Sequence, residues 1–429
     1  MQPSLYSDFE EQIVTKTDNA STFLHNLKLP IHRWFRYSAG FSAEWVRKLL
    51  AQQKAEGRRT VLDPFAGCGT VLLEAESAGI PALGIEAHPF VSRVARTKLL
   101  WRQESCLFRD YALSVLHRAR KISDLSGFSC PPLIHKCFPP EAISRLYSLY
   151  KAWHSVADDS PFSELTWLVL ISILRECSPV GTAQWQYVLP NKSKANFSDP
   201  YKAFEHKVYL VAADMALRQG FNHGPQAALH CEDARECASV PDHWADLVIT
   251  SPPYANNYDY ADATRLEMTF LGDVQGWGHL QDVVRKYLIR SCTQHVAKMH
   301  GATFEMLTDP VLDPIRRELV AVCKKLEAEK ENHGGKKPYH TMMTTYFIDM
   351  AKVWIALRRA TSKGAQLCFV IGDSAPYGIY VPVHIWLGRL AIAAGFESFH
   401  FNKLRDRNVK WKNRKHRVPL SEGYLWIKG

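Results

Sequence analysis

A glycine turn between two predicted strands is the feature that most constrains the fold. The segment Arg58–Phe90 reads RRTVLDPFAGCGTVLLEAESAGIPALGIEAHPF. Thr60–Asp63 is a short apolar run, the apolar residues after the turn recur at helical spacing, and Gly79 is placed to end that helix. Ala82–Glu86 is then a second strand. A strand, a helix and another strand form a βαβ unit, which predicts an α/β fold with a doubly wound, mostly parallel sheet.

Helical stretches interrupt this pattern twice. Residues 90–227 show mostly helical periodicity, with a loop-like link at residues 178–200, and residues 261–340 are again mostly helical. Residues 228–254 restore a strand, a short helix and a buried strand, and a later helix leads through a Lys-Gly turn to the strand Gln366–Ile371. We therefore predict one α/β domain with two helical insertions. Its parts are an N-terminal segment with the first half of the sheet (1–90), a first insertion (91–227), a return to the sheet (228–271), a second insertion (272–340), and the remaining sheet with a basic C-terminal segment (341–429).

The excess of basic residues points to a polyanionic partner. The 429 residues carry a formal charge of +10, and cations concentrate between residues 403 and 417, where a single acid, Asp406, opposes them. Basic residues interleaved with an aromatic one, here Trp411, suit a phosphate backbone with a stacking platform, and the alternative is a solvated charge run. The basic residues of this window are Lys403, Arg405, Arg407, Lys410, Lys412, Arg414, Lys415 and Arg417.

No metal, membrane span or export signal is expected. The ten cysteines form no CxxC pair, so we expect reduced thiols rather than a zinc site. The apolar runs, such as Leu165–Leu174, are too short to span a membrane. The N-terminal MQPSLYSDFEEQIV carries acids where a signal peptide needs a basic start. A cytoplasmic location is therefore predicted.

The glycine turn also predicts a binding site. It opens a helix, whose N-terminus presents free N–H groups and the positive end of the helix dipole. Glu86 ends the next strand, where an acid can accept the ribose hydroxyls of a nucleoside cofactor. Leu72 stands where a dinucleotide fingerprint has its third glycine, which disfavours NAD, and a purely structural turn is the alternative. Asp233, after the third strand, could accept the exocyclic amine of an adenine or could cap a helix.

A second motif ends a buried strand. Leu247–Ile249 runs into Ser251-Pro252-Pro253-Tyr254. Two consecutive prolines remove two backbone donors and hold the chain extended. A rigid, donor-poor corner beside a hydroxyl and an aromatic ring favours a site that accepts hydrogen bonds from a ligand. The alternative is a strand terminator with incidental neighbours.

The motifs DPFAGCGT, GIEAHP, CEDARE and TSPPY, in this order, resemble the amino-methyltransferases that use S-adenosylmethionine. Within that family Ser-Pro-Pro-Tyr is typical of cytosine-N4 DNA methyltransferases, whereas adenine-N6 enzymes more often carry Asp-Pro-Pro-Tyr or Asn-Pro-Pro-Tyr. The resemblance covers residues 30–90 and 228–260 and, more loosely, 340–400. It implies the Rossmann-like fold of class I methyltransferases.

The resemblance implies S-adenosylmethionine as the cofactor and gives roles to matching positions. The turn would line the methionine side of the cofactor, the acid that ends the second strand would hold the ribose, and the acid after the third strand would hold the adenine amine. A motif that closes over the cofactor is matched loosely by residues 29–41, with Arg33, Trp34 and Tyr37 as candidates, and core aromatics explain that stretch equally well. The implied cofactor-binding residues are Asp63, Pro64, Phe65, Gly67, Gly69, Thr70, Glu86 and Asp233.

The implied chemistry is methyl transfer to an exocyclic base amine, which is a poor nucleophile because its lone pair is delocalised. The Ser251 hydroxyl and the Pro252 carbonyl would accept its N–H groups, and Tyr254 would offer a ring to a base flipped out of a duplex. The methyl group would move by in-line displacement, without a cysteine nucleophile or a metal. Residues 256–260 either shape the pocket or make turns. The candidates are Ser251, Pro252, Pro253 and Tyr254 for catalysis, and Asn256, Arg405, Arg407, Lys410, Lys412, Arg414, Lys415 and Arg417 for nucleic-acid binding.

We therefore predict a cytosine-N4 methyltransferase that acts on double-stranded DNA. The first insertion is the expected target-recognition region, the second insertion competes for that role, and the basic C-terminal residues would contact phosphates. The alternatives are adenine-N6 methylation of DNA, methylation of an RNA base amine, and a catalytically silent nucleic-acid-binding subunit. A role in restriction–modification, with a companion restriction or defence protein, is left open.

Overall fold

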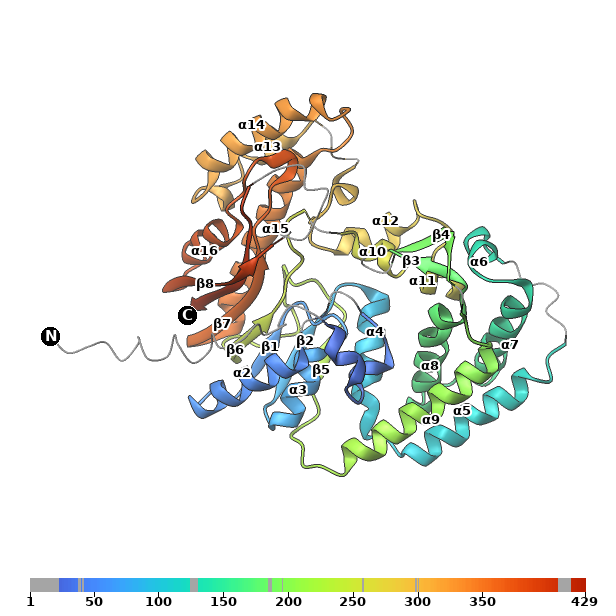
Figure 1. Cartoon of the computed structure of the whole chain (residues 1–429). Coiled ribbons are helices and arrows are strands. Elements are labelled where there is room, and N and C mark those ends of the chain that lie inside the picture. Colours follow the sequence, from blue (N-terminus) through green and yellow to red (C-terminus); the bar gives the residue numbers. More distant parts are fainter. Residues whose placement is uncertain are drawn as a thin grey trace.

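The computed structural model describes residues 23–37, 40, 42–123, 130–183, 187–194, 196–256, 258–297, 299, 301–407 and 418–429. Its centre is a seven-stranded sheet of order β5-β2-β1-β6-β7-β9-β8 (Figure 1). The first five strands in that order pair in parallel, and β9 is antiparallel to both neighbours. The predicted mostly parallel α/β fold is confirmed. The strands are β1 (Val61–Asp63), β2 (Ala82–Ile85), β5 (Ala228–His230), β6 (Ala245–Thr250), β7 (Thr361–Gly372), β8 (Ser398–Asp406) and β9 (Ser421–Lys428).

Both faces of the sheet are buried, because alternate strand residues enter two different hydrophobic cores. Val61 and Ile249 belong to one core, and Leu62 and Val248 belong to the other. The first face is covered by α2 (Ala43–Ala55), α3 (Thr70–Ala78) and α4 (Pro89–Lys98), and the second by α15 (Tyr339–Ala360) and α16 (Val383–Ala393) (Figure 1). The carboxyl ends of the parallel strands therefore meet at one edge of a rigid frame.

The predicted βαβ unit forms as the sequence indicates. Gly69 precedes α3 with φ 83°, and Gly79 ends it with φ 70°, both in the left-handed region that glycine tolerates best. A Cβ on Gly84 would lie 2.7 Å from a methyl carbon of Leu72. The close approach of helix and strand is thus obtained with a glycine on the strand, opposite a leucine on the helix.

The first insertion is a helical lobe beside the sheet (Figure 1). The predicted loop-like link at residues 178–200 instead contains a β-hairpin, in which Tyr187 directly precedes the second strand. Helix α4 contacts both β5 and α8, and so joins this lobe to the sheet. The elements of the lobe are η3 (Leu99–Arg102), α5 (Ser105–Ala119), α6 (Pro132–Cys137), α7 (Pro140–Val156), α8 (Pro161–Cys177), β3 (Val180–Thr182), β4 (Val188–Ser193) and α9 (Pro200–Gln219).

The second insertion is built from short helices and ends in the long helix α14, which packs against α15. Helix α15 is buried along most of its length, so it is the central support of this side of the molecule. Two short helices, α10 (Tyr260–Ala263) and α11 (Arg265–Leu271), precede the second insertion. Its own elements are α12 (Leu280–Val283), η5 (Arg285–Tyr287), η6 (Thr293–Val296), α13 (Thr303–Met306), η7 (Pro310–Leu312) and α14 (Arg316–Asn332). Three short 3-10 turns lie elsewhere, namely η1 (Phe23–Lys28), η2 (His32–Trp34) and η8 (Pro376–Gly378).

Two local predictions are wrong. The short helix expected between β5 and β6 is replaced by turns, in which Cys237 and His243 have φ of 46° and 55°, values that no right-handed helix allows. The Lys-Gly turn before Gln366 lies within β7 as a bulge, with Gly364 at φ 76°. In both places pairing with a distant strand decides the local structure.

Two further observations concern the whole described chain. None of the described helices combines the length and the apolar character that crossing a bilayer requires. All ten cysteines lie within the described residues and are unpaired thiols, most of them buried.

Candidate active site

An open pocket with an empty volume of about 770 Å³ lies at the carboxyl ends of the parallel strands. Its lining joins the glycine turn, Glu86, Asp233 and the Ser-Pro-Pro-Tyr loop, which are up to 190 residues apart in the chain. This is the place where α/β sheets bind their ligands. The lining residues are Tyr37, Gly40, Pro64, Phe65, Ala66, Gly67, Cys68, Thr70, Glu86, Ala87, His88, Asp233, Ala234, Ser251, Pro253, Tyr260, Tyr287, Leu288 and Ile289.

The glycine turn is held open by Glu86. The Gly67 N–H donates to one Glu86 oxygen at 2.8 Å, and the His88 N–H donates to the other at 2.8 Å. Gly67 has φ 52°, and a Cβ there would lie 3.1 Å from the ring of Tyr37. Gly69 precedes α3 and offers no side-chain cap to the first N–H groups of the helix. Gly69 itself does not line the pocket, whereas Thr70 at the start of the helix does. Because a missing side chain keeps this cradle free and an acid borders it, the residues fit a nucleoside cofactor.

Asp63 and Glu86 are both acids with weakened acidity. Burial raises the pKa of Glu86 to about 7, although the two backbone N–H bonds lower it. Burial likewise raises the pKa of Asp63 to about 7, opposed by hydrogen bonds from the Thr250 hydroxyl at 2.6 Å and the Phe65 N–H at 3.1 Å. Asp63 is not among the lining residues, because it lies beneath them and ties β1 to β6.

Asp233 lines the pocket and is gripped by a single arginine. The Nε of Arg235 lies 2.9 and 2.8 Å from the two carboxylate oxygens of Asp233, and the Arg235 backbone N–H donates to one of them at 2.9 Å. The helix that Asp233 could have capped is absent, since turns follow β5. A carboxylate held in one direction at the pocket wall can accept hydrogen bonds from a polar ligand.

The Ser-Pro-Pro-Tyr loop closes the other end of the pocket. Ser251 and Pro253 line it, whereas Pro252, which is buried, and Tyr254 are not among the lining residues. The Ser251 hydroxyl donates to the Val370 carbonyl of β7 at 3.4 Å, which leaves its lone pairs available as acceptors. Burial raises the pKa of Tyr254, so its hydroxyl stays protonated.

The ring of Tyr254 has a cationic neighbour. The guanidinium of Arg407 lies 4.8 Å from the ring centroid, and its Nη1 donates to the Asp373 carbonyl at 2.7 Å. Arg407 was expected at a phosphate, and the structure instead brings it against a residue of the loop. Arg405 pairs with Glu422 at 3.0 Å.

The remaining nucleic-acid candidates divide into two groups. Asn256 follows the loop in the left-handed region, with φ 60°. Lys403 pairs with Asp406 at 2.7 Å. Lys410, Trp411, Lys412, Arg414, Lys415 and Arg417 lie outside the described residues, as does Asn257.

Only one of the three candidates in the stretch proposed to close over the cofactor, residues 29–41, lines the pocket. Tyr37 lines the pocket, but Arg33 and Trp34 do not. The indole N–H of Trp34 donates to Asp214 of α9 at 3.0 Å, and the Nε of Arg33 donates to the same carboxylate at 3.0 Å. These two residues fasten the N-terminal segment to the first insertion.

The sequence interpretation missed part of the lining. Tyr287, Leu288 and Ile289 come from the second insertion and line the pocket near Asp233, whose partner Arg235 also donates to the Tyr287 carbonyl. No local pattern distinguishes them. His88 also lines the pocket, and its position two residues after Glu86 could have indicated it. Burial lowers the pKa of His88 to about 4, and its Nε2 lies 2.9 Å from the Thr264 hydroxyl, so the ring is neutral.

A buried polar group follows the loop. Ligand atoms of Asp259, Cys292 and His295 lie within 4.8 Å of one another, a spacing that could suit a metal. However, the guanidinium of Arg285 already binds Asp259, at 2.9 and 2.6 Å. Burial alone would raise the pKa of Asp259, but hydrogen bonds from His295 and Arg285 lower it to about 2. We interpret the group as an anchor that holds the loop to the second insertion.

A second anchor comes from the first insertion. The backbone N–H of Asp259 donates to the hydroxyl of Tyr187 at 2.6 Å. Tyr187 lies in the connection between β3 and β4, so the hairpin touches the chain five residues after Tyr254. Both insertions therefore contact the loop that borders the pocket.

Over nearly its whole length the chain is similar to Type II methyltransferases. It is 26% identical over 449 residues to the Type II methyltransferase M.BsoBI of Geobacillus stearothermophilus, with 94% of this chain and 86% of that protein covered. It is 27% identical over 404 residues to the Type II methyltransferase M.AvaI of Nostoc sp. and of Anabaena variabilis, with 87% of this chain and 81% of the relative covered. No protein-family model matches the chain.

Proposed function

We propose that this protein transfers a methyl group from S-adenosylmethionine to the exocyclic N4 amine of a cytosine in DNA. The observation that carries the proposal is one pocket whose lining joins the glycine turn, Glu86 and Asp233 to Ser251 and Pro253. A cofactor half and an amine-accepting half thus share one cavity. The similarity to Type II methyltransferases along almost the full chain supports methyl transfer, and the Ser-Pro-Pro-Tyr form supports cytosine over adenine.

The cofactor half binds by accepting hydrogen bonds. Glu86, oriented by two backbone N–H groups, would accept the ribose hydroxyls, and Asp233 would accept the adenine amine. The cradle at Gly67 would take the methionine end, beside Pro64, Phe65 and Thr70. When bound, the cofactor supplies an electrophilic methyl group on a sulfonium. Asp63, beneath the turn, adds negative charge near that cation when it is ionised.

The amine half acts by positioning. The Ser251 hydroxyl and the Pro252 carbonyl would accept the two N–H groups of the cytosine amine, which allows the nitrogen to become tetrahedral as it attacks. The cofactor would supply its methyl group to the nitrogen held by these acceptors and leave as S-adenosylhomocysteine, and the nitrogen would release one proton to solvent. Because the prolines offer no competing N–H donors and β7 fixes Ser251, little reorganisation is needed.

The Tyr254 ring would stack on the flipped base. Arg407 lies over this ring and fixes its orientation through a cation–π contact. A flipped base adds a second stacking partner, which stabilises it outside the duplex.

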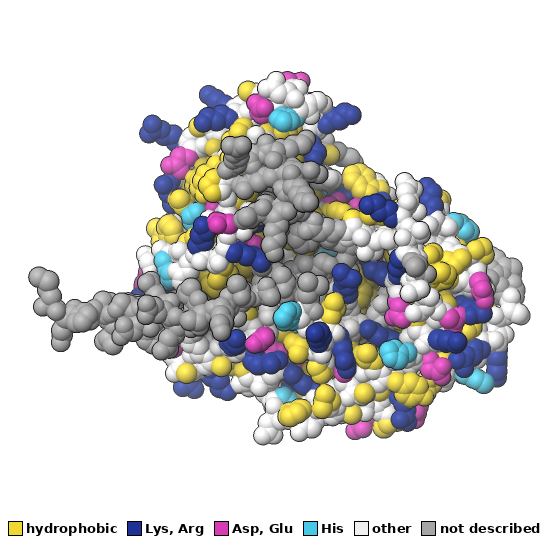
Figure 2. All heavy atoms as spheres, viewed as in Figure 1, with side chains coloured by type: hydrophobic (Ala, Val, Ile, Leu, Met, Phe, Trp, Pro, Cys, Tyr) yellow, Lys and Arg dark blue, Asp and Glu magenta, His cyan; other side chains and the backbone are white. Residues whose placement is uncertain are grey.

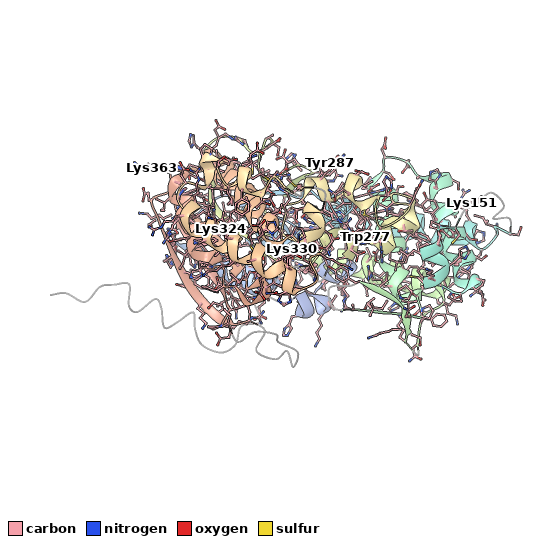
Figure 3. All side chains as sticks on the ribbon, turned by 90° about the horizontal axis from the view of Figure 1, so that it is seen from above. Lys151, Trp277, Tyr287, Lys324, Lys330 and Lys363 are labelled. Carbon is pink, nitrogen blue, oxygen red and sulfur yellow. The ribbon has the colours of Figure 1, made fainter. Side chains whose placement is uncertain are left out.

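The surface around the pocket supports a duplex as the substrate. Lys and Arg side chains lie among acidic ones across the face shown in Figure 2. Figure 3 shows Lys324 and Lys330 of α14 on one side of Tyr287, and Trp277 of the second insertion and Lys151 of α7 on the other. Tyr287, which lines the pocket, is 42% exposed, so a flipped base could enter beside it from a duplex lying along these residues.

The first insertion is the proposed target-reading region, with the second insertion as the competing candidate. The hairpin supports this choice, because its strand β4 exposes Asn191 and Lys192 while Tyr187, in the connection between β3 and β4, contacts Asp259. Exposed amide and ammonium groups are suited to base edges.

The test uses S-adenosylmethionine with an isotopically labelled methyl group. The protein is incubated separately with unmethylated genomic DNA and with total RNA, each is digested to nucleosides, and the products are resolved by mass spectrometry. We expect label in N4-methylcytosine from DNA. Label in N6-methyladenine would correct the base, and label only in RNA would overturn the DNA assignment.

The matched control is Ser251→Ala, which removes one amine acceptor without touching the cofactor half. It should bind S-adenosylhomocysteine as wild type does while losing about 10²-fold or more in methylation rate. Cofactor binding by the wild type without label in either nucleic acid would identify a silent binding subunit.

A further inference from the structure

One end of the pocket has two walls that come from distant parts of the chain. Asp233 and Ala234 follow β5, and Tyr287, Leu288 and Ile289 belong to the second insertion. About 50 residues separate the walls, so neither can hold the other in place through local structure. Something outside the pocket has to fix their separation.

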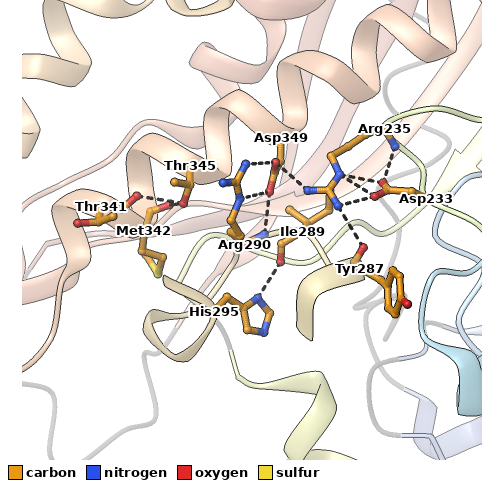
Figure 4. A network of polar contacts seen from close by, with 10 residues as sticks. All are labelled: Asp233, Arg235, Tyr287, Ile289, Arg290, His295, Thr341, Met342, Thr345 and Asp349. Atoms are coloured by element: carbon orange, nitrogen blue, oxygen red, sulfur yellow. Dashed lines mark hydrogen bonds and ion pairs between the residues drawn. The ribbon is translucent and has the colours of Figure 1, made fainter. Parts of the chain in front are cut away.

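Asp349 lies in the middle of α15 and contacts the arginine that directly follows each wall, Arg235 after Ala234 and Arg290 after Ile289 (Figure 4). Its side chain is fully buried. One carboxylate oxygen accepts Nη1 of Arg235 at 3.0 Å. The other accepts the backbone N–H of Arg290 at 3.0 Å and the Nε of Arg290 at 2.9 Å. The Nη2 of Arg290 adds a further bond to Asp349. A single carboxylate therefore binds two arginines, one next to each wall of the pocket.

Each arginine is held by Asp349 and in turn holds one wall of the pocket in place. Arg235 grips both oxygens of Asp233 through its Nε, and its Nη2 also donates to the Tyr287 carbonyl at 3.4 Å. Arg290 directly follows Ile289, whose carbonyl is held by His295 at 3.1 Å (Figure 4). The direction of the Asp233 carboxylate and the position of residues 287–289 both depend on the same buried acid.

The charges of this cluster balance. Asp233 and Asp349 carry two negative charges, and Arg235 and Arg290 carry two positive charges. Burial alone would raise the pKa of Asp349, but hydrogen bonds and charge from Arg290, with charge from Arg235, lower it below its ordinary value. The carboxylate therefore stays ionised, which a buried acid does only when it is paired.

We propose that Asp349 is a positioning residue for the adenine of the cofactor. It holds Arg235, which aims the Asp233 carboxylate at the adenine amine, and it holds the 287–289 wall at the distance that admits the ring. Asp349 does not itself line the pocket. This inference rests on the proposed cofactor. It adds a residue that lies 116 positions after Asp233 in the chain and acts on the cofactor through Asp233.

The experiment compares two ligands by calorimetry with the full-length protein. S-adenosylhomocysteine carries the adenine amine, and S-inosylhomocysteine carries an oxygen in its place. Wild type should prefer the adenine ligand. Asp349→Asn keeps the shape of the side chain and removes its charge, so we expect the Kd of S-adenosylhomocysteine to rise about tenfold, as for the removal of a hydrogen bond to a charged group, with a smaller change for S-inosylhomocysteine. A merely structural role would raise both values by the same factor, which would overturn the proposal.

Two variants control for stability. Glu267→Gln removes another buried carboxylate with an arginine partner, Arg175 of α8. Neither residue lines the pocket, so this variant should leave both ligand affinities unchanged. If Asp349→Asn does not fold, Arg235→Gln keeps the Asp349–Arg290 pair and should reduce the preference for adenine. An unchanged preference in that variant would also overturn the proposal. Failure of the wild type to bind S-adenosylhomocysteine would instead contradict the proposed function.

Discussion

Two acids around the pocket change protonation state near neutral pH. Burial raises the pKa of Glu86 and of Asp63 to about 7 in each case. Both are therefore mainly ionised at pH 8 and mainly protonated at pH 6. The nearby His88, with its pKa lowered to about 4, stays neutral over this range. Burial and the charge of Glu86 raise the pKa of Tyr37, so its hydroxyl also stays neutral.

We predict that cofactor affinity falls as the pH falls through 7. An ionised Glu86 accepts hydroxyl donors with both oxygens, whereas a protonated one has a donor of its own to satisfy. The Kd of S-adenosylhomocysteine should rise by up to about tenfold per pH unit below the pKa, measured by calorimetry from pH 8 to pH 6. Glu86→Gln should bind weakly with a flatter profile, and Asp63→Asn separates the share of the second acid. A constant Kd in the wild type would contradict the role of Glu86.

We predict that Arg407 affects the methyl-transfer step and not cofactor binding. Its guanidinium lies over the Tyr254 ring and is outside the pocket lining. Arg407→Ala removes a cation–π contact of about 0.5–2 kcal/mol, so the single-turnover rate should fall about 2- to 30-fold while the Kd of S-adenosylhomocysteine stays constant. Arg405→Ala is the matched control, because Arg405 and Arg407 both approach the Glu422 carboxylate and this variant keeps the contact of Arg407 with the Tyr254 ring. Equal rates for the two variants would show that the ring needs no such support.

At the scale of elements, the helix and the strand of the first βαβ unit approach closely because the strand carries a glycine opposite a leucine of the helix. A dinucleotide fingerprint puts the third glycine on the helix so that helix and strand can approach. Here the helix carries Leu72, and the strand carries Gly84 opposite it. The local requirement is the missing Cβ at one contact, and either element can supply it.

We predict that Gly84→Ala destabilises the fold without changing its topology. The added methyl would lie 2.7 Å from a Leu72 carbon and 3.1 Å from the Ala66 side chain. Overpacking of this kind costs about 1–3 kcal/mol in the free energy of unfolding, measured in urea. Gly276→Ala is the control, because no atom lies within 4 Å of a Cβ there. The double variant Leu72→Ala/Gly84→Ala should lose less free energy of unfolding than the two single variants lose together. Strict additivity of the two losses would contradict the contact.

Periodicity predicted well the elements whose structure is determined by residues close together in the sequence. Strand β1, helix α3 and strand β2 were predictable because apolar spacing and two glycines fix them locally. The β3–β4 hairpin was not, since its strands are short, polar in part and interrupted by Pro190. The bulge at Gly364 was not either, because it exists only in register with β6.

At the scale of the whole molecule, the two insertions and the basic C-terminal stretch determine how the protein meets its substrate. Of that stretch, Lys403, Arg405 and Arg407 lie within the described chain, and each contacts an acid or a ring. The basic residues from 410 to 417 lie outside it. Their contribution can be measured through salt dependence.

We predict that the five cations from 410 to 417 neutralise most of the phosphates that the protein touches. Replacement of Lys410, Lys412, Arg414, Lys415 and Arg417 by glutamine should reduce the slope of log K against log salt by about 0.9 for each phosphate that is no longer neutralised. Duplex affinity is measured by fluorescence anisotropy over a range of salt concentrations. The Kd of S-adenosylhomocysteine should not change. An unaltered slope would identify the stretch as a solvated charge run.

The pocket shows how far sequence reasoning reaches at this scale. The turn, Glu86 and Asp233 were predicted as one site from their positions after strands and from the family resemblance. The wall at 287–289 and its support by Asp349 were not, since they depend on contacts across 52 to 114 residues. One signal was present: Asp349 is a lone acid in the apolar stretch of α15.

The hydrogen bond between Tyr187 and the backbone of Asp259 has a consequence for anyone who would exchange the first insertion for that of a relative. Such a chimera would import new reading residues and at the same time remove the acceptor of a buried N–H, unless the donor protein has a hydroxyl at the same place. Grafts should therefore keep Tyr187 or carry the donor's own residues 256–260 with them. Recombination between diverged genes meets the same restriction, so compatible pairs of hairpin and loop would be inherited together.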